Sequence, residues 1–247
     1  MAITAAELKA YGSLNMPESD TTTSGGGIDT TCMIEFADLA VNDVVRAVST
    51  NAGDTTQTAA VTGRTAAGAI VTDNIALNGT TPVAGTTTFQ RVLKIILSAT
   101  AAGTVTVERN TTPFDDVIAI PTGVTKVRRL FYDSASEAGA TARYEKVFFK
   151  NTNATLTLNA AKTQLTADPS AKIKIANATT VSDTGSVANR KTLPAGLTWV
   201  DDNVAQDVPG QALAAGAAIG VWAELSLTAG DSPLDSTFTL ELSGTTT

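Results

Sequence analysis

The most constraining feature of the sequence is a central run of short alternating segments, RYEKVFFKNTNATLTLNAAKTQLTADPSAKIKIA, which begins at Arg143 and ends at Ala176. Residues 144–150 are rich in aromatic and branched side chains, and residues 172–175 alternate lysine with isoleucine. A period of two places successive side chains on opposite faces of a strand. The run therefore predicts consecutive β-strands, each with one face buried, separated by polar turns at residues 151–153 and 167–170.

The same pattern of short apolar runs and turn signals continues along most of the chain and predicts an all-β fold. Turns about every ten residues between short strands are typical of β-sandwiches. The chain has 247 residues, enough for two ordinary domains. We expect two immunoglobulin-like β-sandwich domains, residues 28–110 and 111–247, with the boundary at the Asn-Thr-Thr-Pro turn of residues 110–113.

Residues 1–27 are predicted to form a short N-terminal arm and a linker. Thr4 and Glu7 have the spacing of a capping box at the start of a short helix. Ile3, Leu8 and Tyr11 would give that helix a narrow apolar stripe. Residues 16–27 are rich in Ser, Thr and Gly, which favours a flexible linker. Such an arm can reach onto a neighbouring subunit; an unstructured tail is the alternative.

The charge of the chain is negative overall and unevenly distributed. A net charge of −7 and a pI near 4.6 argue against a nucleic-acid-binding protein, which needs a basic face. Residues 121–190 hold 10 basic and 5 acidic residues, whereas residues 1–120 hold 6 and 12, and residues 191–247 hold 1 and 7. The basic middle either pairs with the acidic flanks within one fold or docks head-to-tail onto a neighbouring subunit.

Several kinds of chemistry are excluded by composition. The chain has no histidine, which removes Ser-His-Asp triads, Cys-His pairs and zinc sites with His ligands. Cys32 is the single cysteine and lies in an apolar, strand-like run, so we expect it to be buried and structural. No Gly-rich segment has the context of a phosphate-binding loop. We expect no catalytic residue, no cofactor and no metal site, and we do not expect an enzyme.

Two acidic pairs and two tryptophans leave alternatives open. Asp115 and Asp116, and likewise Asp201, Asp202 and Asp207, are best interpreted as solvated loop acids; catalysis by either pair and calcium binding by the second group are alternatives. In residues 219–225, alternation places Trp222 opposite the face of its apolar neighbours. This favours a half-exposed Trp222 at a subunit contact over a sugar-stacking platform formed with Trp199.

The N-terminus shows no secretory signal, because it lacks a basic start and an apolar core segment. No apolar run approaches the roughly 20 residues that a membrane-spanning helix needs. We therefore expect a protein made in the cytoplasm, with no membrane partner.

Several strings resemble those of structural proteins of tailed-bacteriophage particles with immunoglobulin-like sandwiches. They are residues 61–63 (VTG), 69–79 (AIVTDNIALNG), 85–89 (GTTTF), 103–107 (GTVTV), 144–151 (YEKVFFKN), 168–175 (DPSAKIKI) and 213–222 (LAAGAAIGVW). The likeness spans most of residues 28–245 and is a general similarity of these strings, without one diagnostic motif. Within that class the chain is most similar to capsid decoration, or cement, proteins.

The resemblance implies a protein of the outer capsid surface, made in the bacterial host, whose partners are the major capsid protein and further copies of itself, as a homotrimer. A neck, collar or tail position, or a carbohydrate-binding module on the virion that attaches to host glycans, are the alternatives. The residues expected at capsid or subunit contacts are Ile3, Leu8, Tyr11, Arg128, Arg129, Lys146, Lys150 and Trp222.

Overall fold

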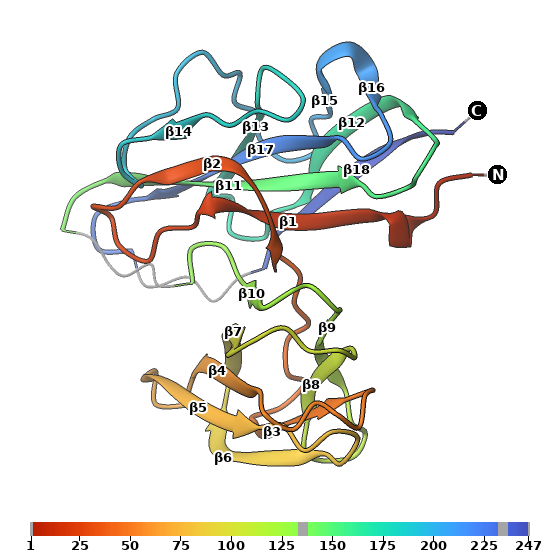
Figure 1. Cartoon of the computed structure of the whole chain (residues 1–247). Helices are drawn as coiled ribbons and strands as arrows, with labels where there is room; N and C mark the ends of the chain where they lie inside the picture. The colour runs from red at the N-terminus through yellow and green to blue at the C-terminus, as the bar shows by residue number, and fades with distance from the viewer. Residues whose placement is uncertain (1, 133–137, 232–236, 247) are drawn as a thin grey trace. The chain divides into compact units, whose positions relative to one another are not determined.

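The computed structural model describes residues 2–132, 138–231 and 237–246, with the side chain of Asp116 left out. It confirms the expected all-β sandwich class: half of the chain lies in strands, and within the described residues the helical part is limited to the 3₁₀ turns η1 (Ala5–Glu7) and η2 (Pro209–Gln211) (Figure 1). The strands in chain order are β1 (Leu8–Asn15), β2 (Ser24–Met33), β3 (Asp43–Ser49), β4 (Thr58–Arg64), β5 (Ile70–Ala76), β6 (Val83–Phe89), β7 (Arg91–Leu97), β8 (Val105–Arg109), β9 (Asp116–Ile120), β10 (Lys126–Arg128), β11 (Thr141–Asn151), β12 (Leu158–Ala167), β13 (Ile173–Asn177), β14 (Ser186–Val187), β15 (Gln206–Asp207), β16 (Ala212–Leu213), β17 (Ala218–Leu227) and β18 (Thr239–Thr245).

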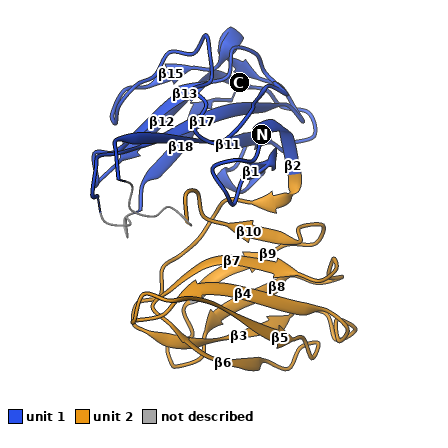
Figure 2. Cartoon of the chain, turned by 90° about the vertical axis from the view of Figure 1, so that its left-hand side faces the viewer, with its two compact units in different colours: residues 1–29, 133–247 blue, residues 30–132 orange. Residues whose placement is uncertain are grey.

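The chain forms two compact units that differ from the predicted domains (Figure 2). Unit 1 combines residues 1–29 with residues 133–247, and unit 2 is the continuous segment 30–132 between them. The predicted boundary at residues 110–113 is wrong, because β9 pairs with β8 and β10 pairs with β7. The chain therefore returns to the same unit after Pro113. A Pro-containing turn marks a reversal of the chain equally well inside a domain and between domains.

Unit 1 contains two sheets. In the larger one the strand order is β13-β17-β11-β1-β2, and β14 pairs with the start of β2; in the smaller one β12 lies between β15 and β16 on one side and β18 on the other. The strands β11 and β17 pair over ten residues, from Thr141 opposite Leu227 to Lys150 opposite Ala218. Both are buried along nearly their whole length, so they form the centre of the unit.

The N-terminal arm predicted from the sequence is instead an internal strand of unit 1. Leu8 pairs with Asn151 and Tyr11 with Phe148, and β1 lies between β11 and β2. The predicted capping box is present, since the Glu7 carboxylate accepts a hydrogen bond of 2.8 Å from the Thr4 N–H, but it caps one 3₁₀ turn. So short a helix is marginal in water, and pairing with β11 takes its place.

The predicted linker is also ordered, because the glycines at its end belong to β2. Gly25 and Gly26 have φ values of 95° and 90°, which only glycine adopts readily. A Cβ atom on Gly25 would lie 2.5 Å from the ring of Trp222. These glycines therefore permit a close approach of backbone to an aromatic ring.

Unit 2 is a two-sheet sandwich in which the end of β2 is followed by β10, β7, β4 and β5 in one sheet, while the other has the order β6-β3-β8-β9. The sheets bury alternate residues, including Phe89, Ile95 and Val107; Cys32 is fully buried, as expected. The carboxylate of Asp73 on β5 accepts hydrogen bonds from the backbone N–H groups of Thr86 (2.6 Å) and Thr87 on β6. This side chain joins the two sheets along one seam.

At one end of unit 2 a second buried carboxylate, Asp54, ties several loops together. It accepts hydrogen bonds from the Ser49 hydroxyl (2.6 Å) and from the backbone N–H groups of Ala102 (2.9 Å) and Gly103 (3.0 Å). These bonds favour the ionised form, with the bond from Ser49 first among them, and they lower the pKa of Asp54.

We predict that Asp54→Asn destabilises unit 2 in a pH-dependent way. A carboxyl whose folded pKa lies below its unfolded value of 3.8 stabilises the fold above that value, and the contribution is lost as the pH falls through the folded pKa. The urea midpoint of the variant should therefore lie below that of the wild type at pH 7, and the two should converge below about pH 4. Glu35→Gln, at an exposed carboxylate of the same unit, is the control. An equal effect of both substitutions would contradict the role of Asp54.

We also predict that deletion of residues 1–15 unfolds unit 1, because it removes a strand from the interior of a sheet. Deletion of residues 1–6 leaves β1 intact and should lower the thermal midpoint by only a few degrees, whereas the longer deletion should lower it by more than about 10 °C or abolish the transition. Circular dichroism with temperature separates these results. A fully folded product of the longer deletion would show that residues 8–15 act as a detachable arm.

Candidate contact surface

The residues predicted to contact a partner are divided between the two units, and several of them are buried. Six of them belong to unit 1: Ile3, Leu8, Tyr11, Lys146, Lys150 and Trp222. Arg128 and Arg129 belong to unit 2, at the end of β10 and just after it. Three of the eight, Arg128, Lys146 and Trp222, are buried within the chain, which corrects the prediction that they lie at a contact.

Lys146 is fully buried in the centre of unit 1. Its ammonium group donates hydrogen bonds to the carbonyl oxygens of Gly26 and Gly185, each at 3.1 Å, and forms an ion pair with Asp183. The rings of Phe148 and Trp222 lie 5.0 and 5.4 Å from its nitrogen. Burial lowers the pKa of Lys146, and Asp183 opposes this.

The three N–H groups of the Lys146 ammonium therefore have three oxygen acceptors inside the protein. Two of these acceptors belong to the start of β2 and to the residues before β14, which Lys146 holds against β11. A lysine on an alternating strand is expected to face water, and this one instead joins the start of β2 and the loop before β14 to β11.

Trp222 is only 4% exposed, so the expectation of a half-exposed tryptophan is wrong. Its ring packs against Gly25 and Lys146. Alternation failed here because β17 is covered on both faces, so the face opposite the apolar neighbours is buried too. A buried ring cannot stack on a sugar. Trp199 is half-buried and lies against Tyr144, with ring centroids 5.5 Å apart.

A second group of buried charges surrounds Asp20, in the connection between β1 and β2. Arg143 donates two hydrogen bonds to the Asp20 carboxylate, at 2.8 and 2.9 Å, and Lys191 lies 3.0 Å from it. These bonds, with that of Arg143 first, lower the pKa of Asp20 to about 2 against the effect of burial. Beside it, the buried Arg190 lies 3.0 Å from the fully buried Glu145.

Several basic residues of the segment 121–190 form ion pairs with acidic residues of the two flanking segments. Arg143 binds Asp20 from the acidic N-terminal flank, and Lys172 binds Asp231 from the acidic C-terminal flank. Lys174 lies 3.6 Å from Asp201. The segments of opposite charge therefore pair within one fold, which was the first of the two alternatives.

Apart from Arg128, the remaining predicted contacts are half-buried. In unit 2, Arg128 is 1% exposed, with its guanidinium 4.9 Å from the Tyr132 ring, whereas Arg129 is half-buried and lies 2.6 Å from Asp38. In unit 1, Leu8 and Tyr11 are half-buried in β1, and burial raises the pKa of Tyr11. Ile3 and Lys150 are also half-buried.

The acidic pairs are engaged in local interactions. Asp115 lies 3.0 Å from Arg109; the side chain of Asp116 lies outside the described part of the chain. Asp202 accepts a hydrogen bond of 2.9 Å from Asn203, and Asp207 lies 3.4 Å from Lys162. The described residues contain no cluster of three or more acidic, His or Cys side chains placed to hold a metal ion.

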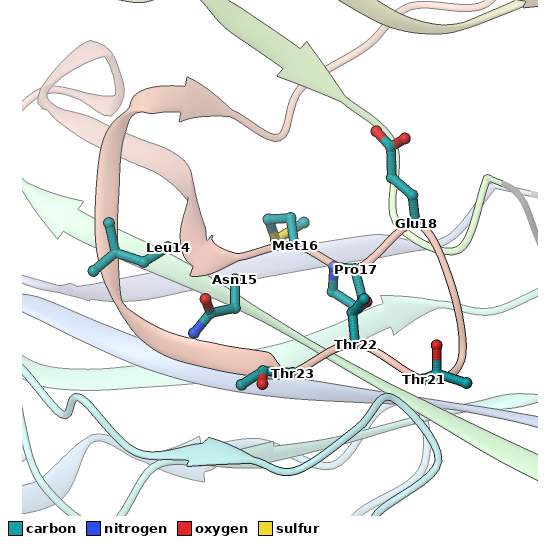
Figure 3. A pocket seen from close by; sticks show the side chains of 8 residues that line it. All are labelled: Leu14, Asn15, Met16, Pro17, Glu18, Thr21, Thr22 and Thr23. Atoms are coloured by element: carbon teal, nitrogen blue, oxygen red, sulfur yellow. The ribbon is translucent and has the colours of Figure 1, made fainter.

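One pocket was not anticipated from the sequence. It has a volume of about 550 Å³ and is open to solvent. Figure 3 shows the eight side chains that line it, which run from the end of β1 through the connection to β2: Leu14, Asn15, Met16, Pro17, Glu18, Thr21, Thr22 and Thr23. Glu18 is the single ionisable group among them, so the lining offers no acid–base pair.

The fold places the chain in the class of all-β proteins built from two sandwich units. No family model, no curated protein and no solved structure matches it. Within the described residues, no helix is long and apolar enough to cross a membrane.

We predict that Lys146→Met lowers the stability of unit 1 by about 1–3 kcal/mol, because two buried carbonyl groups and Asp183 lose their donor. Lys150→Met, four residues further along β11, is the matched control and should change stability by less than about 0.5 kcal/mol. Urea unfolding followed by tryptophan fluorescence measures both. An unchanged midpoint for Lys146→Met would contradict the internal role of this lysine.

Proposed function

We propose that the chain is a structural protein of a tailed-bacteriophage particle, and specifically a decoration, or cement, protein of the outer capsid surface. Its partners would be the major capsid protein and further copies of the chain, arranged as a homotrimer. A protein that binds only the assembled shell stabilises that state by mass action. The strings that resemble phage virion proteins support this proposal; they lie on or overlap the strands β4, β5, β6, β8, β11, β13 and β17.

The observation that carries the proposal is the way in which the chain uses its few charges. Charged residues are 17% of the sequence, against about 25% in ordinary soluble domains. Several of them are buried in internal pairs, among them Arg143, Glu145, Lys146 and Arg190. Fewer charges than in an ordinary soluble domain therefore remain for the outer surface, which suits a protein surrounded by neighbours in an assembly.

The proposal predicts a high copy number in purified phage particles. Quantitative mass spectrometry, with the major capsid protein as internal standard, should find the chain in the same order of abundance as that protein. A small number of copies per particle would replace decoration by a neck, collar or tail position. Absence from the particle would overturn the virion proposal altogether.

A further inference from the structure

The basic residues of unit 1 are, with two exceptions, bound by carboxylates of the same unit. Unit 1 holds nine lysines and arginines, all of them in its described part. Seven form ion pairs: Arg143 and Lys191 with Asp20, Lys146 with Asp183, Lys162 with Asp207, Lys172 with Asp231, Lys174 with Asp201, and Arg190 with Glu145. The side chains of Lys9 and Lys150 form no ion pair or hydrogen bond with the residues that the structure describes.

The two exceptions are direct neighbours. The strands β1 and β11 lie side by side and run antiparallel (Figure 1), and Lys9 pairs with Lys150. Directly opposed residues of an antiparallel pair project from the same face, with Cβ atoms about 4.5–5.5 Å apart, and like charges there are destabilising. We call Lys9 and Lys150 the lysine pair. A single lysine at a surface needs no explanation, but two facing lysines do in a unit that otherwise pairs its basic residues internally.

The residues around the lysine pair provide no internal counter-charge. On β17, the residue opposite Lys150 is Ala218. Glu7 lies just before β1, but its carboxylate accepts hydrogen bonds from the Thr4 N–H, at 2.8 Å, and from the Asn153 amide, at 2.7 Å. The repulsion within the lysine pair is therefore not relieved by an ion pair inside the described part of the chain.

A tyrosine lies beside the lysine pair. Tyr11 is two residues beyond Lys9 on β1 and therefore projects from the same face. All three side chains are half-buried, and the hydroxyl of Tyr11 has no hydrogen-bond partner among the described residues. Tyrosine is enriched at protein–protein contacts, where its ring is covered and its hydroxyl is hydrogen-bonded. Two ammonium groups and a phenol thus offer donors on one face of the sheet.

We infer that the lysine pair, with Tyr11 beside it, is a contact site for an acidic segment of a partner protein. Carboxylates of that segment would take the place of the internal partners that the other seven basic residues of unit 1 have. Charge complementarity carries the inference, because two facing lysines are costly to the isolated sheet and favourable once a negative group lies between them.

Other anionic partners fit this site less well. Proteins that bind nucleic acids neutralise several phosphates, and anionic membranes are bound by clusters of about four to eight basic residues, whereas this site has two lysines. Small ligands are usually held in concave sites. The lysine pair lies on the face of a sheet and does not line the pocket of Figure 3.

The remaining charge of unit 1 restricts how such a partner docks. Unit 1 holds 16 acidic residues against 9 basic ones, so it repels an acidic surface in general. The lysine pair is the exception within its described part, and an acidic segment is therefore directed to this place. The inference does not rest on the virion proposal, since it concerns a property of the purified protein.

The test is the binding of a synthetic peptide of about ten glutamates to the purified full-length chain, measured by isothermal titration calorimetry in about 20 mM salt. We expect a dissociation constant between about 10 and 500 μM, and at least about tenfold weaker binding in about 200 mM salt. Lys9→Met and Lys150→Met should each weaken binding at least about fivefold, because each removes one of the two charges. At low salt, both substitutions should also raise the thermal midpoint by about 1–2 °C, because they remove a like-charge repulsion.

Lys162→Met is the matched control, because it removes the same charge from unit 1 at a more exposed lysine that already pairs with Asp207. It should leave peptide binding unchanged, and circular dichroism should show that all the variants remain folded. The inference is overturned by a wild-type chain that does not bind the peptide at about 1 mM, or by equal losses with Lys162→Met and Lys150→Met. Inorganic phosphate that binds as tightly as the peptide, and that requires both lysines, would overturn it in favour of a small-anion site.

Discussion

Unit 1 depends on the complete enclosure of β11. The strand pairs with β17 along ten residues on one side and with β1 along five on the other. Where it extends beyond β1, the backbone N–H of Tyr144 donates to the carbonyl of Arg190, and its carbonyl accepts from the Ser24 hydroxyl at 2.6 Å. Residues 143–149 of the strand are buried, so the charged side chains among them must also find partners inside the protein.

The need to pair those charges fixes the loops around the sheet. A buried ion without a partner destabilises the fold by several kcal/mol, so each buried charge of β11 needs an opposite charge nearby. The pairs are Arg143 with Asp20, Glu145 with Arg190, and Lys146 with Asp183. Asp20 lies in the connection after β1, and the other two lie in the long segment between β13 and β15. Loops that contain few apolar residues are thereby ordered through electrostatics, and fewer charges remain for the surface.

Features of the fold that depend on residues close together in the sequence could be predicted, whereas those that depend on distant residues could not. Periodicity is local, and the strands expected at residues 144–150, 172–176 and 219–227 correspond to β11, β13 and β17. The partner of a strand is not local. The pairing of Leu8 with Asn151 leaves no trace in the residues around Leu8, so the sequence predicts an arm where the structure has β1. The insertion of unit 2 was missed for the same reason.

The prediction that Lys146 and Trp222 lie at a contact is wrong for a related reason. Alternation separates the two faces of a strand but cannot tell whether the polar face is covered, and at Lys146 and Trp222 it is covered by the start of β2. A signal was present in the sequence: the triple glycine of residues 25–27 is as consistent with a backbone passing close to a large ring as with a flexible linker.

The charged residues of β11 also have a role during folding, because the strands that pair with β11 lie far from it in the sequence. Unit 2 is continuous and contains all of its strand partners within residues 30–132, so it can close early. Unit 1 needs β1 from the beginning of the chain and β17 from near its end, a pairing of high contact order. Until β17 is in place, β11 has an open edge and three aromatic residues, Tyr144, Phe148 and Phe149, and this combination favours aggregation. Charged residues beside such a segment oppose intermolecular pairing, so the same Arg143, Glu145 and Lys146 that are costly to bury keep the unpaired strand soluble until their partners arrive.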